Sequence, residues 1–351
     1  PANHRMVLDL HGERYALRCD QVGLADELRR YFAAFVSGDS NAPVSVTISA
    51  YERSTLAFDP AEVITPPLGR GSKRLKEQYV ERPDGRFVLK TRTGMVFGFG
   101  GPHNIAVGPC NANPNQVVNF VNNRLMSRAL ERGAVLAHAA AVAKDGAAIA
   151  FAGFSGMGKS TTALHLMNVP DTVFVSNDRL LLHAGSDGEV MAAGVPKHPR
   201  INPGTALHNP ALAGIVSDEK AATLRALPRD ELWQLEDKYD AIVEQCCGPD
   251  RFRLLAPLRA FVVLNWDTPS APMLVTECAI SERADLLEAI MKGPGLFHRP
   301  GSPIPTPNPR DYLEMLRDVP IIEFSGGPDF EGAVRECLRL FERASSRRDT
   351  P

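Results

Sequence analysis

Short alternations of apolar and polar residues follow one another along the first part of the chain. This period of two is typical of strands buried on one face, and it occurs in RMVLDLHG, VSVTISAY, QYVERPDGRFVLKTRTGMVFGFG and HNIAVGP. The Pro-Asp-Gly sequence inside RPDGRF predicts a hairpin turn, and residues 24–36 carry the period of a helix. The pattern predicts an α+β domain over residues 1–112, with a loop at 65–74.

The remaining residues, 113–351, show longer helical periods and strands made of continuous apolar runs. Two short apolar runs flank Lys144-Asp145-Gly146, and the second of them, AAIAFA, is typical of a fully buried strand. Further elements are predicted as helices at 113–133, 281–292 and 330–343, strands at 171–178 and 258–266, a hairpin across 185–188 and a proline-rich loop at 299–310. This pattern favours an α/β core with C-terminal helices.

The amino-acid composition indicates the class of protein and bears on which classes of partner it binds. A chain of 351 residues with 44% hydrophobic and 23% charged residues fits a globular protein of two domains, or of one domain with a large extension. The net charge of −2 implies no general affinity for nucleic acid or for an anionic membrane. The first residues show no signal-peptide pattern, and the six scattered cysteines form no C-x-x-C pair. We therefore expect a cytoplasmic protein, and a homo-oligomer stays open.

The stretch GFSGMGKST, residues 153–161, follows the apolar run AAIAFA directly. Its spacing matches the phosphate-binding loop G-x-x-x-x-G-K-[ST], in which glycines let the backbone approach an anion closely. Lys159 supplies a cation for the terminal phosphates, and the Ser160 hydroxyl suits Mg²⁺. A helix beginning near Ser160 would add free N–H groups. We predict ATP binding by Gly153, Phe154, Ser155, Gly156, Met157, Gly158, Lys159, Ser160, Thr161 and Lys197.

Three places outside this loop carry candidate chemistry. Asp178 ends an apolar strand, as a carboxylate near a nucleotide-bound metal would, so Ser160 and Asp178 are the predicted Mg²⁺ ligands. His138 lies on a strand of small apolar residues, where it is either a hydrogen-bonded core residue or a catalyst. The loop GVPKHPRINPG places Lys197 and Arg200 between prolines, which suits a phosphoryl clamp, an acidic acceptor or a plain basic turn.

The segment LAHAAAVAKDGAAIAFAGFSGMGKSTTALHLM, with VFVSND after it, resembles the core of HPr kinase/phosphorylase and of the HPr kinase-related proteins. The resemblance covers 134–200 and, more loosely, the chain to Trp266. It implies a P-loop kinase core in which the residue matching Asp178 acts on the acceptor hydroxyl, with His138 close by. Bifunctional members have GKSE and a pair of acids, whereas Thr161 and Asn177 stand here, so the HPr kinase-related proteins are the nearer resemblance.

Three classes of function are consistent with these residues. The first is a kinase that transfers the γ-phosphoryl group of ATP to a hydroxyl of a protein, peptide or small molecule, with Asp178, His138, Lys159 and Arg200 as catalytic residues. The second is a nucleotide-dependent switch or ATPase that uses water. The third, an inactive binding module, would be expected to lack Lys159 or Asp178. The chain has neither the guanine motif N-K-x-D nor L-S-G-G-Q.

Overall fold

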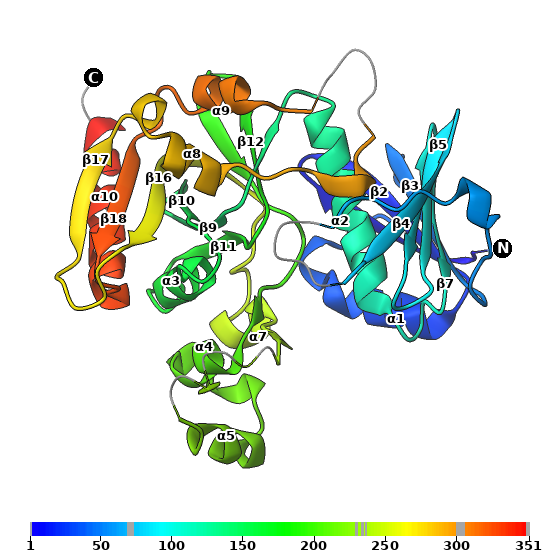
Figure 1. The fold of residues 1–351 in the computed structure, drawn as a ribbon, viewed down its shortest axis with the longest axis horizontal. Coiled ribbons are helices and arrows are strands. Elements are labelled where there is room, and N and C mark those ends of the chain that lie inside the picture. Colours follow the sequence, from blue (N-terminus) through cyan, green and yellow to red (C-terminus); the bar gives the residue numbers. More distant parts are fainter. Residues whose placement is uncertain are drawn as a thin grey trace. The chain divides into compact units, whose positions relative to one another are not determined.

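The computed structural model describes residues 2–68, 74–228, 231–232, 235, 237–299 and 306–348, without the side chains of 213 and 343–348. It is a mixed α/β structure with several sheets, drawn as a ribbon in Figure 1. The loop predicted at 65–74 lies partly outside the described residues, as does half of the proline-rich loop at 299–310. None of the described helices combines the length and apolar character that a membrane span requires.

The chain divides into two compact units. Unit 1 comprises the described residues of 1–129 and 294–305, and unit 2 those of 130–293 and 306–351. The division falls at the end of a long helix, after Ala129, and not after residue 112. The reason is that Phe120 of this helix packs against Phe97 and Phe99 of the unit 1 sheet, at ring-centroid distances of 4.9 and 6.4 Å.

The described residues of unit 1 form a sheet of seven strands in the order β1-β2-β3-β7-β6-β5-β4. The β4–β5 pair is the hairpin predicted from RPDGRF, and β2 is a strand that the sequence pattern did not indicate. The elements are β1 (His4–Leu10), β2 (Glu13–Cys19), β3 (Val46–Glu52), β4 (Glu77–Arg82), β5 (Gly85–Lys90), β6 (Val96–Gly100), β7 (His103–Gly108), α1 (Val22–Tyr31), α2 (Pro114–Leu130) and the 3₁₀ turns η1 (Ala33–Phe35), η2 (Pro60–Glu62) and η5 (Gly295–Phe297).

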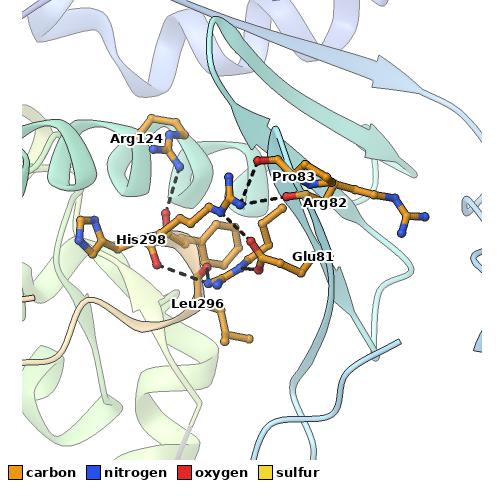
Figure 2. A network of polar contacts seen from close by, with 9 residues as sticks. Glu81, Arg82, Pro83, Arg124, Leu296 and His298 are labelled. Atoms are coloured by element: carbon orange, nitrogen blue, oxygen red, sulfur yellow. Dashed lines mark hydrogen bonds and ion pairs between the residues drawn. The ribbon is translucent and has the colours of Figure 1, made fainter. Parts of the chain in front are cut away.

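Arginine side chains connect the segment around η5 to the rest of unit 1 by hydrogen bonds, as Figure 2 shows. Arg86 donates to the carbonyls of Leu296 and His298 at 2.9 and 3.4 Å, and Arg124 donates to that of Phe297 at 3.0 Å. Arg299 reaches the carbonyl of Arg82 at 2.9 Å. Charged donors satisfy the carbonyls of a segment that forms no strand, which explains why residues from the far end of the sequence belong to unit 1.

Unit 2 is built on a larger sheet whose described part has nine strands. One side of the sheet runs in the order β11-β9-β10-β16-β18-β17, and the other side in the order β8-β12-β13-β16. Its strands are β8 (Val135–Ala137), β9 (Ala140–Lys144), β10 (Ala147–Ala152), β11 (Val173–Ser176), β12 (Leu180–Ala184), β13 (Val190–Ala193), β16 (Leu255–Trp266), β17 (Leu274–Cys278) and β18 (Ile321–Gly326). The strands predicted at 171–178 and 258–266 and the 185–188 hairpin are present; β17 and β18 were not predicted.

Helices cover both faces of this sheet. They are α3 (Lys159–Leu166), α8 (Ala284–Ile290, after the 3₁₀ turn η4, Ile280–Glu282), α9 (Pro309–Met315) and α10 (Phe330–Arg348). Ala148, Ala150 and Ala152 of β10 belong to one core with α8 and α9, and the alternate residues Ile149 and Phe151 point to the opposite face. There α3 contacts β10 and α10 contacts both α3 and β16. The two faces of β10 therefore belong to different helix layers of unit 2.

A small helical lobe follows β13 and precedes β16, with its own apolar core under α3. It consists of β14 (Arg200–Ile201), α4 (Pro203–Leu207), η3 (Pro210–Ile215), α5 (Asp218–Arg225), β15 (Tyr239–Asp240) and α7 (Val243–Cys247). Leu164 of α3 is part of this core. Arg251, just after the lobe, donates to the carbonyls of Met167 and Val169 at 3.0 and 3.1 Å. The lobe and Arg251 therefore hold α3 from its side and its C-terminal end.

Candidate functional site

Three strand ends meet at one edge of the unit 2 sheet. Strand β9 pairs antiparallel with both β10 and β11, so β10 and β11 run in the same direction. The register sets Phe151 of β10 opposite Ala140, and Ser176 of β11 opposite Ala141. The carboxyl ends of β10 and β11 therefore lie beside the start of β9. This topology brings the glycine loop after β10, His138 before β9 and Asp178 after β11 to the same edge.

The glycine loop between β10 and α3 has the backbone conformation that its sequence predicts. Gly153, Gly156 and Gly158 have φ values of 147°, 89° and 84°, in the region that side chains disfavour. A Cβ on Gly153 would lie 2.7 Å from the carbonyl oxygen of Leu264, and one on Gly158 would lie 2.8 Å from the Phe330 ring. The indole N–H of Trp266 donates to the carbonyl of Met157 at 3.0 Å. The loop is thus held close to β16 and α10.

Lys159 and Ser160 occupy the first turn of α3. The Lys159 ammonium donates to the carbonyls of Gly153 and Phe154 at 2.7 and 3.1 Å, so it lies back over the loop. The Ser160 hydroxyl donates to Oδ1 of Asn177 at 2.7 Å. Strand order therefore links the start of α3 to the end of β11 through Asn177, the neighbour of Asp178.

The start of α3 suits an anion. Its first turn holds no acidic residue, and its N-cap is Gly158, which makes no side-chain hydrogen bond to the free N–H groups. Phe154, Ser155 and Gly156 are exposed, whereas Gly153 is buried. The Thr161 hydroxyl is buried and lies 3.3 Å from that of Thr205 in α4, so Thr161 connects α3 to the helical lobe. The exposed loop and the uncapped helix start can together receive phosphate oxygens.

Asp178 is the centre of a second cluster. His138 Nε2 and Lys292 Nζ each lie 3.1 Å from its Oδ1, and Arg179 Nε lies 3.9 Å from its Oδ2. The Asp178 side chain is 55% exposed, whereas that of His138 is 28% exposed. A carboxylate in this position is open to a molecule from solvent while one of its oxygens is held by two donors.

The backbone at Asp178 is in the left-handed region, with φ 67°. Aspartate tolerates this region better than most residues, but the conformation persists only where its surroundings hold it. Ser176 does so, because its hydroxyl donates to the carbonyl of Arg179 at 2.5 Å and accepts from the N–H of Val195 at 3.3 Å. The turn therefore aims the Asp178 side chain out of the end of β11.

The loop after β13 lies directly on this turn. Gly194 is so close to β11 that a Cβ there would lie 1.8 Å from the carbonyl oxygen of Val175. His198 is buried, accepts the N–H of Val243 on Nδ1 at 3.2 Å and packs on the Phe252 ring. Lys197 is half-buried. The loop is therefore part of the packed structure and is not the solvated basic turn that its sequence also allowed.

Lys197 shares the electrostatic environment of the Asp178 cluster, whereas Arg200 is paired with a different carboxylate. Burial, together with the charges of Arg179 and Arg200, lowers the pKa of Lys197 to about 8, against the opposing effect of the Asp178 charge. Arg200, by contrast, faces β15, where its Nε lies 3.1 Å from Asp240 Oδ1. Arg200 therefore has a carboxylate partner of its own. This partner reduces the positive charge that Arg200 could offer to a phosphoryl group, the role predicted for it from sequence.

Positive charge outweighs negative charge around Asp178. Burial would raise the pKa of Asp178, but the hydrogen bond from His138 and the charge of Lys292 outweigh it and lower the pKa below its ordinary value. Burial lowers the pKa of Lys159 to about 8, although the charge of Asp178 raises it. Burial likewise lowers the pKa of Lys292. An anion placed among these lysines would restore their preference for the charged form.

The oxygens available to a metal ion are those of Ser160, Asn177 and Asp178. Hydroxyl, amide and carboxylate oxygens are ligands suited to Mg²⁺, which keeps several waters when it binds with a nucleotide. The structure links Ser160 to Asn177 rather than to Asp178, the partner predicted from sequence. Among the described residues, no group of three or more His, Cys, Asp or Glu side chains is arranged to hold a metal by itself. The donors fit a metal that arrives with phosphate oxygens.

Two residues of the site were not recognised as such from sequence. Lys292 is the last residue of the helix predicted at 281–292 and precedes Gly-Pro, so nothing in the local sequence indicates a role in the site. The pairing of Met291 with Ala137 brings it to Asp178. Asn177 was noted as a replacement for an acid, but its bond to Ser160 depends on strand order. His138 occupies the break between β8 and β9, which the sequence pattern had merged into one strand.

Comparisons with known proteins give a distant likeness to solved structures. No protein-family model matches the chain, and no curated protein matches it. Among solved structures, the Hpr(Ser) kinase/phosphatase from Coxiella burnetii aligns with 60% of this chain and 98% of its own, at 11% sequence identity and a TM-score of 0.31. A TM-score this low transfers no function to this chain.

Proposed function

We propose that the protein is an ATP-dependent kinase that transfers a γ-phosphoryl group to a hydroxyl of a protein, peptide or small molecule. One observation carries the proposal: a glycine loop with Lys159 and Ser160 shares a sheet edge with an exposed carboxylate, Asp178, bonded to His138. Phosphoryl transfer needs a cradle for the phosphates and a group that orients the nucleophile, and these two clusters supply one each.

The cradle is assigned to the loop 153–158 and the first turn of α3. Backbone N–H groups would bind the phosphate chain, and the Lys159 ammonium would leave the carbonyls of Gly153 and Phe154 for phosphate oxygens. Ser160 and Asn177 would offer oxygens to Mg²⁺, with Asp178 nearby. When bound, Mg²⁺ would neutralise part of the negative charge on the phosphates. Lys197, on the adjoining loop, would add positive charge beside the transferring group.

Asp178 is assigned to the acceptor hydroxyl. Its lowered pKa makes the carboxylate a weak base, so we assign it the task of orienting the hydroxyl rather than of removing its proton early. Orientation is the more valuable contribution when the transition state is loose, because the phosphoryl group is then nearly free before the nucleophile bonds to it. Its 55% exposure leaves room for an acceptor hydroxyl carried by a larger molecule.

The experiment that tests nucleotide binding is a thermal melt with Mg²⁺ and ATP. At a ligand concentration of 100 times Kd, binding stabilises a protein by about 2.7 kcal/mol, which raises the melting temperature by roughly 5 °C or more. Lys159→Ala is expected to abolish this rise, since it removes the cation from the cradle, and to change the melt without nucleotide by less than about 2 °C.

Lys144 provides the matched control, because it lies on β9 at the turn away from the glycine loop and its side chain is 21% exposed. Lys144→Ala is expected to keep the full nucleotide-induced rise. An unchanged rise in Lys159→Ala would show that the loop does not bind ATP through this lysine and would remove the basis of the proposal.

A further inference from the structure

Lys292 is a charged residue of the site that has no role in the reaction proposed above. Its Nζ lies 3.1 Å from Asp178 Oδ1, on the same oxygen that His138 Nε2 approaches at 3.1 Å. It comes from the segment after α8, far from Asp178 in sequence. Both donors therefore meet one carboxylate oxygen from two separate parts of the chain.

The backbone that carries Lys292 is fixed on both sides. Met291 pairs with Ala137, and the N–H of Lys292 donates to the carbonyl of Leu136 at 3.0 Å. The Tyr312 hydroxyl donates to the carbonyls of Leu136 and Lys292 at 2.6 and 3.3 Å, which joins α9 to the same point. The His138 N–H donates to the carbonyl of Ile290 at 2.7 Å. Lys292 and His138 thus extend from two backbone segments that are hydrogen-bonded to each other, which fixes the positions from which the two side chains start.

The two oxygens of Asp178 have different surroundings. Oδ1 receives both His138 and Lys292, whereas Arg179 Nε is 3.9 Å from Oδ2, a distance too long for a hydrogen bond. Two donors on one oxygen fix the plane of a carboxylate whose side chain is otherwise 55% exposed. We propose that Lys292 is a positioning residue that, with His138, turns Asp178 so that Oδ2 receives the acceptor hydroxyl.

A purely structural ion pair is the competing explanation, and it predicts different behaviour. An ion pair with a partner this exposed contributes about 0–1 kcal/mol to folding, so its loss would change stability slightly and catalysis not at all. A positioning role predicts a large loss of transfer rate with little loss of nucleotide affinity, because misplacement of a reacting group by about 1 Å can cost 10²-fold. This inference rests on the proposed function.

The test is a single-turnover assay with Mg²⁺ and γ-³²P-labelled ATP, with and without cell lysate, which counts label moved to water and to any acceptor. Lys292→Met is expected to slow transfer by about 10²-fold and to change the ATP dissociation constant by less than about threefold. Lys292→Arg keeps a charged donor and is expected to recover activity to within about tenfold of the unaltered protein. Lys144→Met is the control, at 21% exposure against 22% for Lys292.

A double variant separates action through Asp178 from a general effect. If Lys292 works only by placing Asp178, Asp178→Asn with Lys292→Met is expected to be no slower than Asp178→Asn alone. Multiplied losses in the double variant, or normal transfer in Lys292→Met, would overturn the role of Lys292 and leave the kinase proposal intact. An unaltered protein that binds Mg²⁺ and ATP yet moves its label nowhere would contradict the proposed function itself, and the role of Lys292 with it.

Discussion

Asp178→Asn is expected to slow phosphoryl transfer by about 10²-fold or more, because the acceptor hydroxyl loses the carboxylate that orients it. Asparagine keeps the size of the side chain but presents a neutral amide to His138 and Lys292, which both donate to the present carboxylate. The affinity for ATP is expected to stay within about tenfold, or roughly 1.4 kcal/mol, because the phosphate cradle is built from the loop and α3. Single-turnover transfer and equilibrium nucleotide binding measure the two quantities separately.

Asp145 offers a control whose backbone φ and side-chain exposure are similar to those of Asp178. It has φ 52°, against 67° for Asp178, and its side chain is 60% exposed. It lies in the turn between β9 and β10, at the opposite end of these strands from the glycine loop. Asp145→Asn is therefore expected to transfer at the normal rate, and His138→Ala to lose less than Asp178→Asn. Near-normal transfer by Asp178→Asn would remove Asp178 from the mechanism.

Gly194→Ala is expected to reduce the free energy of unfolding of unit 2 by about 3 kcal/mol or more, at the upper end of overpacking effects. The reason is the contact at β11, since the new Cβ would lie 1.8 Å from the Val175 carbonyl oxygen. Gly194 also donates its N–H to the carbonyl of Leu254 at 2.7 Å, so it cannot move away without breaking that bond. Urea unfolding followed by far-ultraviolet circular dichroism measures the loss.

Gly214 is the matched glycine, in the same unit, with no atom within 4 Å of the position that a Cβ would take. Gly214→Ala is expected to change stability by less than about 0.5 kcal/mol. Equal stability of the two variants would mean that the loop carrying Lys197 is not packed on β11 as described, and the place of Lys197 beside Asp178 would then need revision.

Local sequence patterns were sufficient for the elements that form from neighbouring residues. The apolar run before GFSGMGKST became β10, the helical period after it became α3, and RPDGRF became the β4–β5 hairpin. The same holds for the strand that ends near Asp178. Each of these depends on spacing within about ten residues, where periodicity and turn chemistry are decisive.

Contacts across the sequence were beyond these patterns. Lys292 reaches Asp178 because Met291 pairs with Ala137, and Arg200 turns to Asp240 because two-residue strands β14 and β15 pair. Residues 294–299 belong to unit 1 because Arg86 and Arg124 bind their carbonyls. None of these contacts can be recognised in the local apolar pattern, because each is set by tertiary pairing of charged or backbone groups.

The assignment as a kinase is tested directly by following the γ-phosphoryl group of ATP. A kinase transfers this group to a hydroxyl other than that of water. The measurement incubates the protein, Mg²⁺ and γ-³²P-labelled ATP with a lysate of the native cell, and separates labelled molecules from free phosphate. We expect label on a hydroxyl-bearing acceptor with the unaltered protein and with Asp145→Asn, and almost none with Asp178→Asn or Lys159→Ala. Release of all label as free phosphate, at the same rate with and without lysate, would contradict the assignment as a kinase.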